Sequence, residues 1–334
     1  MKLYKNFFNL LKIITTSNIK RCFYVENEKI FHYLKNKIYK SKKKAVIISS
    51  EKINFSGDNI IFLQFQNLFF LELAFLFLRY KYLYSSTPGL NSHLFRKSLF
   101  KNTKYIYLQH SNISLSMGYQ HNAFIHFDYI QVVNKFQYKD FFDLRKVSNT
   151  KLKVFKSKYD YFNEIYIHNN YFTNRNLLIA PTWNTNFYDT GFFYDLIDIL
   201  RHNKISFTLR PHPMSLKKNE INLNKIETMN LKIDKDTVPN FNKYNFLLSD
   251  WSGIFIEYIY LKKRKPIFFE TQKKKLNKNY ENFFKNKPAE EFLREKFGVI
   301  FNLNQLDEFI NVLNGKDDYF DLSKKEAEIK NFFY

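Results

Sequence analysis

Short apolar runs, separated by segments with helical periodicity, make up most of the chain after Lys42. Apolar runs of about four to eight residues are typical of buried strands, and their alternation with helical segments favours a parallel sheet covered by helices. The predicted strands of this first series cover residues 45–49, 59–64, 105–109, 127–134 and 162–168, and a helix is predicted over residues 67–82.

A polar, turn-rich segment at residues 169–176, NNYFTNRN, precedes a second series. This series predicts strands over residues 176–183, 245–250 and 266–270, a strand followed by a turn over residues 206–213, and helices over residues 192–203 and 254–264. Together the two series predict an α/β protein with two Rossmann-like, doubly wound domains, residues 1–170 and residues 171–334, that face a central cleft. Ligands of such sheets bind at the carboxyl ends of the strands, so polar motifs there are candidates for a site.

Two other segments bear on membrane binding. Residues 60–78 are the most apolar part of the chain, but they contain three amide side chains and one carboxylate, which favours a strand and a buried helix over a transmembrane span. Residues 1–40 are predicted to be helical and basic. A face of this kind can contact a membrane, but we favour an ordinary helix packed on the protein. The apolar residues of that face are Phe7, Leu10, Leu11 and Ile14.

Two features are expected in the C-terminal part of the chain. Residues 271–287, TQKKKLNKNYENFFKNK, are expected to form a charged, mobile segment. Amphipathic helices are predicted over residues 306–313 and 324–333, and the last of these is placed so that it can pack back on the N-terminal domain.

The net charge of +22 indicates an anionic partner, for which nucleic acid, an anionic bilayer and a phosphorylated substrate are the candidates. The codon bias of an AT-rich genome explains the excess of lysine equally well, because it also favours Asn, Ile, Phe and Tyr. The single Cys22 excludes an intrachain disulfide and a cysteine-based zinc site, and it fits a reducing cytoplasm.

His110 is the first candidate for chemistry. It follows a predicted strand in the stretch YIYLQHSNISLSMGY, which places its imidazole at the ligand edge of the sheet. An imidazole titrates near neutral pH and therefore suits a general base. The alternative is a loop histidine that is held by hydrogen bonds.

Arg210 and His212 flank Pro211 in the turn TLRPHP, directly after another predicted strand. Pro211 and Pro213 favour an extended backbone at the residues that precede them, so both side chains are displayed from a stiff turn. Arginine and histidine together form a compact pair of donors for an anion, and we favour this interpretation over a solvated turn.

The stretch FLLSDWSGIFIEY, residues 246–258, is an apolar run with one polar interruption. A helix is predicted to begin just after Gly253, so Ser252 and Gly253 lie at its N-terminus, where free N–H groups and the helix dipole attract anions. The hydroxyls of Ser249 and Ser252 add donors. A plain N-cap accounts for one serine but not for the cluster with Asp250.

Several catalytic motifs are absent from the sequence. The elbow G-x-S-x-G of serine hydrolases is not met, because Asp250 and Ile254 stand at its glycine positions. There is no P-loop, no G-x-G-x-x-G and no His or Cys spacing for a metal, so we expect neither a cofactor nor a metal site.

Taken in this order and spacing, LQHS, SMGY, FDYI, APTW, LRPHP and LLSDWSGIFIEY resemble the CDP-glycerol glycerophosphotransferase family. Members of this family build teichoic-acid-like and capsular polyol-phosphate polymers. The resemblance spans about residues 85–270. It implies a GT-B architecture, with the acceptor side in residues 1–170 and the donor nucleotide held mainly by residues 171–334. It also implies transfer of glycerol phosphate, or a related alcohol phosphate, from a CDP-linked donor to an acceptor hydroxyl, with release of CMP.

The resemblance also implies roles for individual residues. His110 is the candidate base for the acceptor hydroxyl, and His212 with Arg210 is expected to stabilise the donor diphosphate. Glu257, one helical turn further on, is expected to reach the ribose or cytosine. The segment expected to bind the donor phosphates comprises Ser249, Asp250, Ser252 and Gly253. This set needs no metal in principle, because phosphoryl transfer depends mainly on positioning and charge neutralisation.

Two alternatives remain open. The first is a GT-B glycosyltransferase that uses a CMP- or UDP-linked sugar for a surface polysaccharide. The second is a basic nucleic-acid-binding protein, although no recognised motif accompanies the lysine clusters and we do not expect nucleic acid as a partner. The expected partners are a CDP-activated donor, a lipid-linked or saccharide acceptor and an anionic membrane surface, with a cytoplasmic location, peripheral on the inner face of the cell membrane.

Overall fold

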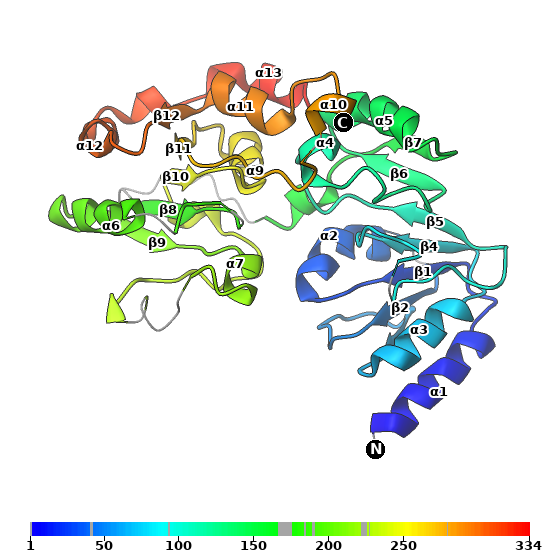
Figure 1. Ribbon diagram of the computed structural model, residues 1–334. Coiled ribbons are helices and arrows are strands. Elements are labelled where there is room, and N and C mark those ends of the chain that lie inside the picture. Colours follow the sequence, from blue (N-terminus) through cyan, green and yellow to red (C-terminus); the bar gives the residue numbers. More distant parts are fainter. Residues whose placement is uncertain are drawn as a thin grey trace.

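The computed structural model describes residues 2–40, 43–92, 94–165, 176–183, 185–188, 191–221, 226, 228–278 and 280–334. Within these residues, strands of the first half form a seven-stranded sheet and strands of the second half form a five-stranded sheet. Helices cover both sheets (Figure 1). The predicted α/β architecture of two parallel sheets is confirmed.

The N-terminal sheet has the strand order β3-β2-β1-β4-β5-β6-β7, and every neighbouring pair is parallel. This order changes direction between β1 and β4, which is the switch point where open α/β sheets bind ligands. All five residues of β2 are buried, as is typical of a parallel strand covered on both faces. The strands are β1 (Arg21–Tyr24), β2 (Ala45–Ser49), β3 (Ile60–Gln64), β4 (Tyr82–Ser85), β5 (Lys104–Tyr107), β6 (Tyr129–Val132) and β7 (Lys153–Lys156).

The C-terminal sheet has the order β12-β11-β10-β8-β9, again with parallel pairs. Its switch point lies between β8 and β10, and these two strands carry the APTW and SDWSG motifs at their carboxyl ends. The strands are β8 (Asn176–Ala180), β9 (Ser206–Leu209), β10 (Phe246–Ser249), β11 (Ile267–Phe269) and β12 (Val299–Phe301).

Helices connect the strands of both sheets. In the first half they are α1 (Lys2–Thr15), α2 (Glu28–Tyr39), α3 (Leu68–Leu76), α4 (Leu115–Gly118), α5 (Lys135–Val147) and the 3-10 helix η1 (Asp160–Asn163). In the second half they are α6 (Phe192–His202), α7 (Pro213–Lys217), α9 (Ile254–Lys262), α10 (Tyr280–Phe283), α11 (Ala289–Phe297), α12 (Leu306–Asn314), α13 (Glu326–Lys330) and the 3-10 helices η2 (Phe241–Lys243), η3 (Asp317–Phe320) and η4 (Ser323–Lys325).

Several elements differ from the sequence-based expectations. The strands β1 and β4 lie in or next to stretches that were expected to be helical, and β7 and β12 were not predicted. Each has three or four residues and lacks the longer apolar run by which the other strands were predicted. Residues 162–163 belong to η1 instead of a strand. The rest of that predicted strand, the polar segment up to residue 175 and the proposed domain boundary at residues 170–171 lie outside the described residues.

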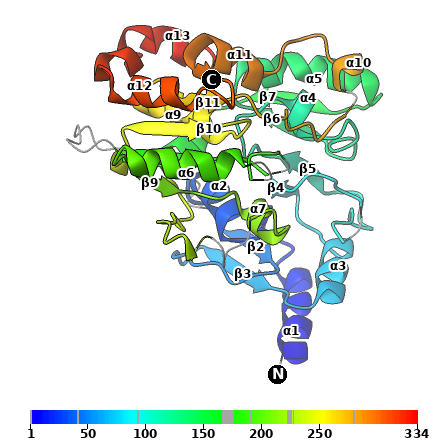
Figure 2. The ribbon, with the colours of Figure 1, turned by 60° about the vertical axis from the view of Figure 1, so that its left-hand side comes forward.

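The C-terminal end of the chain lies beside the N-terminal domain (Figures 1 and 2). The backbone N–H of Lys135 donates to the Phe332 carbonyl at 2.8 Å, and that of Tyr334 donates to the Val133 carbonyl at 3.2 Å. The ring of Phe332 stacks on Phe136 of α5, with 5.6 Å between ring centroids. The two halves of the chain are therefore joined by backbone and aromatic contacts after the last helix.

Residues 271–276, at the start of the segment that we expected to be charged and mobile, also link the two domains. The backbone N–H of Leu276 donates to the Met117 carbonyl at 3.1 Å, and the Trp251 indole donates to the Thr271 carbonyl at 3.3 Å. The lysine side chains in the sequence suggest a solvated loop. The sequence does not reveal the backbone hydrogen bonds that fix this segment in the fold.

Candidate functional site

The candidate residues of the two domains come together where the carboxyl ends of the strands meet. A Cβ atom built on Gly253 would lie 3.1 Å from Ser111 Oγ and 3.2 Å from Ile113 Cγ2. The loop that carries His110 therefore contacts the SDWSG turn of the other domain. We call this region the junction site and define it by Lys29, His110, Arg210, His212, Ser252, Gly253, Glu257 and Lys274.

His110 follows β5 and is held among aromatic rings. Its Nδ1 lies 3.1 Å from the Tyr107 hydroxyl, and its ring centroid is 6.0 Å from each of the Tyr33 and Tyr119 rings. Burial and then the positive charge of Lys29 lower the pKa of His110 to about 4. The imidazole is consequently neutral at neutral pH, with a lone pair available to accept a proton.

His212 follows β9 and caps the N-terminus of α7. Its Nδ1 accepts a hydrogen bond from the backbone N–H of Met214 at 3.1 Å. Burial lowers the pKa of His212 well below its usual value, and the charges of Lys29, Lys274 and Arg210 act in the same direction. In a neutral ring whose Nδ1 accepts, Nε2 carries the proton, so His212 is a hydrogen-bond donor at Nε2.

Arg210 comes from the same turn but is largely committed to its own domain. One guanidinium nitrogen donates to Asp234 Oδ2 at 2.8 Å and the other to the Thr237 carbonyl at 3.3 Å. Its side chain is 14% exposed. Asp234 neutralises part of the charge of Arg210. Arg210 therefore adds a fixed positive potential to the junction site, instead of a guanidinium that is free to bind a phosphate through two N–H groups.

Ser249 and Asp250 hold the turn from inside. Ser249 Oγ donates to the Ala180 carbonyl at 2.8 Å. Asp250 is fully buried and accepts from the backbone N–H of Thr182 at 2.7 Å and from Thr185 Oγ1 at 3.2 Å. Burial raises the pKa of Asp250, and the Thr182 hydrogen bond and Lys274 oppose this shift. These two side chains fasten the ends of β8 and β10 together at the switch point.

Ser252 and Gly253 are half-buried and precede the first turn of α9. Gly253 is the N-cap residue, and no side chain caps the helix there. The anion-binding character that we predicted for SDWSG therefore rests on the backbone of this turn and on Ser252, while Ser249 and Asp250 position it.

Glu257 is 7% exposed on α9, and the Tyr159 hydroxyl donates to its Oε1 at 3.5 Å. Burial raises the pKa of Glu257 to about 7, while the charges of Lys29 and Arg210 lower it. The carboxyl group thus lies between cations from the two domains, Lys29 from α2 and Arg210 from the turn after β9. It titrates close to neutral pH.

Two lysines of the junction site were missed in the sequence. Lys274 Nζ donates to Thr182 Oγ1 at 2.9 Å and lies 4.8 Å from the centre of the Trp183 ring, which in turn is 6.3 Å from His212. Burial lowers the pKa of Lys274 to about 8, and the charges of Asp250 and Glu290 oppose this shift. Lys29, in the first turn of α2, has a pKa lowered by burial and by Arg210.

The signal for these two lysines is weak in the sequence. Lys274 is the middle residue of a run of three lysines. Its two neighbours form ion pairs outside the junction site: Lys273 with Glu291 at 2.8 Å and Lys275 with Glu281 at 2.9 Å. Lys29 follows β1, and since that strand was not predicted, its position at a strand end could not be recognised. Lys29 and Lys274 are nevertheless the charges that lower the pKa of both His110 and His212.

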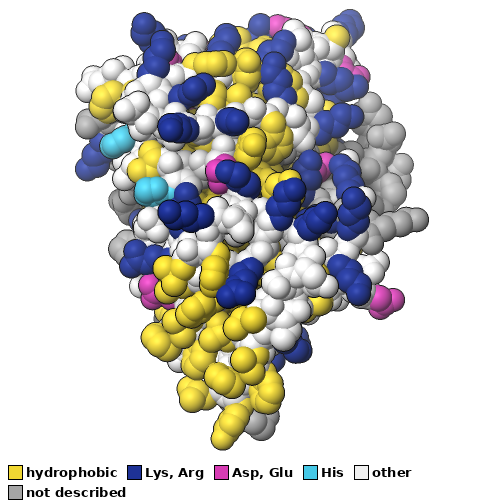
Figure 3. Space-filling model, turned by 90° about the vertical axis from the view of Figure 1, so that its right-hand side faces the viewer, with side chains coloured by type: hydrophobic (Ala, Val, Ile, Leu, Met, Phe, Trp, Pro, Cys, Tyr) yellow, Lys and Arg dark blue, Asp and Glu magenta, His cyan; other side chains and the backbone are white. Residues whose placement is uncertain are grey.

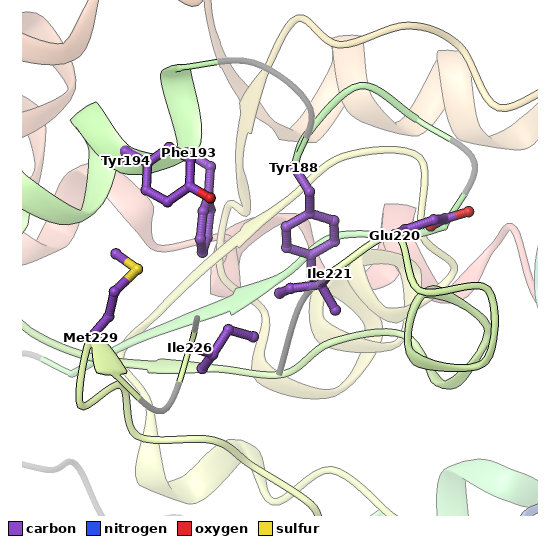
Figure 4. Close-up of a pocket in the computed structure, with 7 residues that line it drawn as sticks. All are labelled: Tyr188, Phe193, Tyr194, Glu220, Ile221, Ile226 and Met229. Carbon is purple, nitrogen blue, oxygen red and sulfur yellow. The ribbon is translucent and has the colours of Figure 1, made fainter. Parts of the chain in front are cut away.

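A small cavity lies beside the C-terminal sheet, next to the junction site, and its lining residues are labelled in Figure 4. It has a volume of about 40 Å³, and its polar lining residues are Tyr188, Tyr194 and Glu220. A volume of this size holds a few water molecules but no nucleotide. Among the described residues, no group of three or more His, Cys, Asp or Glu side chains is arranged to hold a metal ion.

No family model and no curated protein sequence matches the chain. Solved structures do match its fold. The chain is similar to two structures of the wall teichoic acid polymerase TagF, both histidine variants, one after a soak with CDPG. The CDPG structure has a TM-score of 0.57 and 14% identity, with 99% of this chain and 92% of the other covered; the values for the second are 0.54, 13%, 99% and 93%.

A third match is a putative UDP-N-acetylglucosamine 2-epimerase from Listeria monocytogenes, with a TM-score of 0.53, 10% identity and coverage of 94% of each chain. All three matches extend over both domains. The chain has a GT-B fold. This confirms the fold class expected from the sequence. At sequence identities of 10–14%, the comparison shows a shared fold only.

Proposed function

We propose that the protein is a transferase that moves glycerol phosphate, or a related alcohol phosphate, from a CDP-linked donor to an acceptor hydroxyl in the synthesis of a cell-surface polymer or capsule. The carrying observation is that His110 and His212, from different sheets, share Lys29 and Lys274 as cationic neighbours at the junction. The motif resemblance gives the same chemistry. TagF, which shares the fold, is a teichoic acid polymerase studied with CDPG.

In the proposed reaction, the acceptor oxygen attacks the donor phosphorus that carries the alcohol. A new P–O bond forms, the P–O bond between the two donor phosphates breaks, and CMP leaves. His110 takes the proton of the acceptor hydroxyl. His212, as a donor at Nε2, and the ammonium groups of Lys29 and Lys274 offset the charge on the diphosphate, as phosphoryl transfer requires.

The low pKa of His110 has a consequence for the order of events. With a pKa of about 4, the imidazole of the empty enzyme is a weak base. A bound diphosphate would offset the positive charges of Lys29 and Lys274 that lower this pKa, and its own negative charge would raise the pKa towards neutral. We therefore propose that His110 becomes an effective base only after the donor has bound.

The direct test is mass analysis of a candidate acceptor after incubation with CDP-glycerol and purified protein. We expect the mass of one or more glycerol phosphate groups to be added. His110→Ala and His212→Ala should each lower turnover by about 10²–10⁴-fold, the usual contribution of a positioned acid or base. His121→Ala and His202→Ala, at exposed positions, are the matched controls. Turnover like that of the wild type in either site variant would refute the assigned roles.

A nucleotide-sugar glycosyltransferase is the second candidate, and the match to an epimerase whose name contains UDP-N-acetylglucosamine favours it. It would use the same fold and the same cations for the donor phosphates. Thermal unfolding in the presence of CMP, CDP, UMP and UDP distinguishes the two. Stabilisation by CDP supports the alcohol-phosphate transferase, whereas stabilisation by UDP alone would replace it with the glycosyltransferase.

We propose a cytoplasmic enzyme, peripheral on the inner face of the cell membrane, with a lipid-linked or saccharide acceptor. The described residues contain no helix long and apolar enough to cross a bilayer. Binding of the purified protein to vesicles is the measurement that checks this part of the proposal.

A further inference from the structure

Helix α1 packs on the protein with its polar side and exposes its apolar side. Asn6, Asn9 and Ile13 are the buried residues, and Asn9 Nδ2 donates to the Gln64 carbonyl at 2.8 Å. The outward residues are between 43% and 74% exposed: Leu3, Tyr4, Phe7, Phe8, Leu11 and Ile14. A surface helix of a globular protein normally has the opposite orientation. The packed apolar face that we favoured for this helix is therefore wrong at Phe7, Leu11 and Ile14, and only Leu10 of that face packs against the core.

The exposed apolar surface continues onto α3, which packs against α1. Leu68 and Phe69, at the start of α3, are 54% and 63% exposed, and Phe77 at its end is 36% exposed. Nine of the fourteen large hydrophobic side chains that are exposed among the described residues belong to these two segments. Figure 3 shows hydrophobic side chains gathered at the lower end of the molecule, where Figure 1 has α1. Such a concentration marks an interaction surface.

The charges around this surface are almost all positive. Residues 2–20 and 66–81 contain a single acidic residue, Glu72, and its carboxylate is paired with Arg96 at 3.1 Å. Exposed lysines, Lys5 and Lys12, interrupt the apolar side of α1. Just after α1, an open hollow is lined by three cations, three uncharged polar residues and one apolar residue: Lys20, Arg79, Lys81, Ser17, Asn18, Asn102 and Ile19. Apolar residues bordered by lysine and arginine are typical of helices that lie in the interface of anionic bilayers.

We propose that α1 and α3 form a docking surface for a bilayer that contains anionic phospholipids, with the aromatic side chains in the interface and the cations at the headgroups. A second copy of the chain fits this surface less well, because a symmetric pairing would bring Lys5 and Lys12 of both copies together. The inference does not depend on the proposed chemistry, since the junction site contributes no residue to the surface.

The test uses the full chain and vesicles of phosphatidylcholine alone or with about one third phosphatidylglycerol, separated by flotation. We expect binding to the anionic vesicles that weakens as the salt concentration rises. The double variant Phe7→Glu, Phe8→Glu should bind at least about tenfold more weakly, because burial of apolar side chains contributes most of the affinity. Lys12→Gln and Lys20→Gln should each weaken binding by about fivefold.

The control is Tyr319→Glu, which places one glutamate at an exposed aromatic position of the C-terminal domain. It should bind vesicles like the wild type. Circular dichroism and nucleotide-dependent thermal stabilisation, measured on every variant, separate loss of docking from loss of folding or of donor binding. Equal binding by the double variant and the wild type would overturn the proposal, as would failure of the wild type to float with anionic vesicles. A dimer that the same substitutions dissociate would assign the surface to a second copy instead.

Discussion

At the scale of single residues, the junction site separates groups that position the turn from groups that face a ligand. Ser249 and Asp250 have their hydrogen-bonding capacity occupied within the protein. Lys274, by contrast, is a cation held in place by one hydroxyl and one ring, next to His212 through Trp183. Its hydrogen bond goes to a neutral hydroxyl, and Asp250 and Glu290 act on it through their charge, so Lys274 carries the strongest prediction for donor binding.

We predict that Lys274→Met weakens binding of CDP by about 10- to 100-fold, the effect of losing one hydrogen bond to a charged group. The measurement is isothermal titration calorimetry, with Lys273→Met as the matched control because Lys273 pairs with Glu291. An unchanged dissociation constant for the Lys274 variant would contradict this role.

The pH dependence gives a second measurement on the same residue. Lys274 has a pKa of about 8 in the empty protein. As the pH rises through that value the ammonium group loses its charge, so CDP affinity should fall above about pH 8. In Lys274→Arg the guanidinium stays charged, and affinity should remain constant to about pH 10. An alkaline fall that is identical in both proteins would assign the titration to another group.

His110 carries the prediction that tests the order of binding. Its pKa of about 4 in the empty protein is lowered by burial and by Lys29, and a bound diphosphate adds negative charge nearby. We therefore expect its pKa to rise on addition of CDP, by at least about one unit. NMR titration of the histidine Cε1–H signals, assigned with His110→Ala, measures both values. A pKa that stays near 4 with CDP bound would mean that His110 is not the base.

At the scale of elements, the sequence predicted strands well where an apolar run is long and followed by a helix. β2 and β10 match because five or four consecutive apolar or small residues are all buried. β1 and β4 were missed because they lie within or directly after residues 1–40 and 67–82, whose patterns were interpreted as helical. Their position is fixed by pairing with each other and with β2 and β5, which is a long-range property.

The candidate site shows the same division. His110, Arg210, His212 and the SDWSG turn could be found because each follows a predicted strand, and the topology brings strand ends together. The distinction between positioning and ligand-facing groups could not be found, since it depends on which hydrogen bonds are already made. The outward apolar face of α1 was misjudged for a related reason. An amphipathic pattern defines two faces but not which of them the protein covers.

At the scale of the whole molecule, the two sheets are coupled by contacts far from the chain segment that joins them. Both carboxylate oxygens of Glu290, on α11, accept from the backbone N–H of Ser114 at 3.1–3.2 Å. Residues after α13 add the backbone pairing of Asn134 with Phe333 and the aromatic contacts around Phe332. In the proposed reaction the donor would contact groups from both sheets, so we expect the relative position of the sheets to matter for activity.

We predict that Phe332→Ala combined with Phe333→Ala uncouples the domains without unfolding either sheet. Phe332 contacts Phe136, Phe292 and Phe297, and Phe333 contacts Tyr260. Loss of these partly buried rings should lower the free energy of unfolding by about 2–4 kcal/mol.

Calorimetry should then resolve two thermal transitions in place of one. CDP, which we place mainly on the C-terminal domain, should raise the melting temperature of chiefly one of them. Tyr319→Ala, an exposed aromatic change on the same domain, should leave a single transition. If the double variant unfolds in one transition that CDP shifts as a whole, the C-terminal residues are not what couples the domains, and the Glu290 contact becomes the next one to remove.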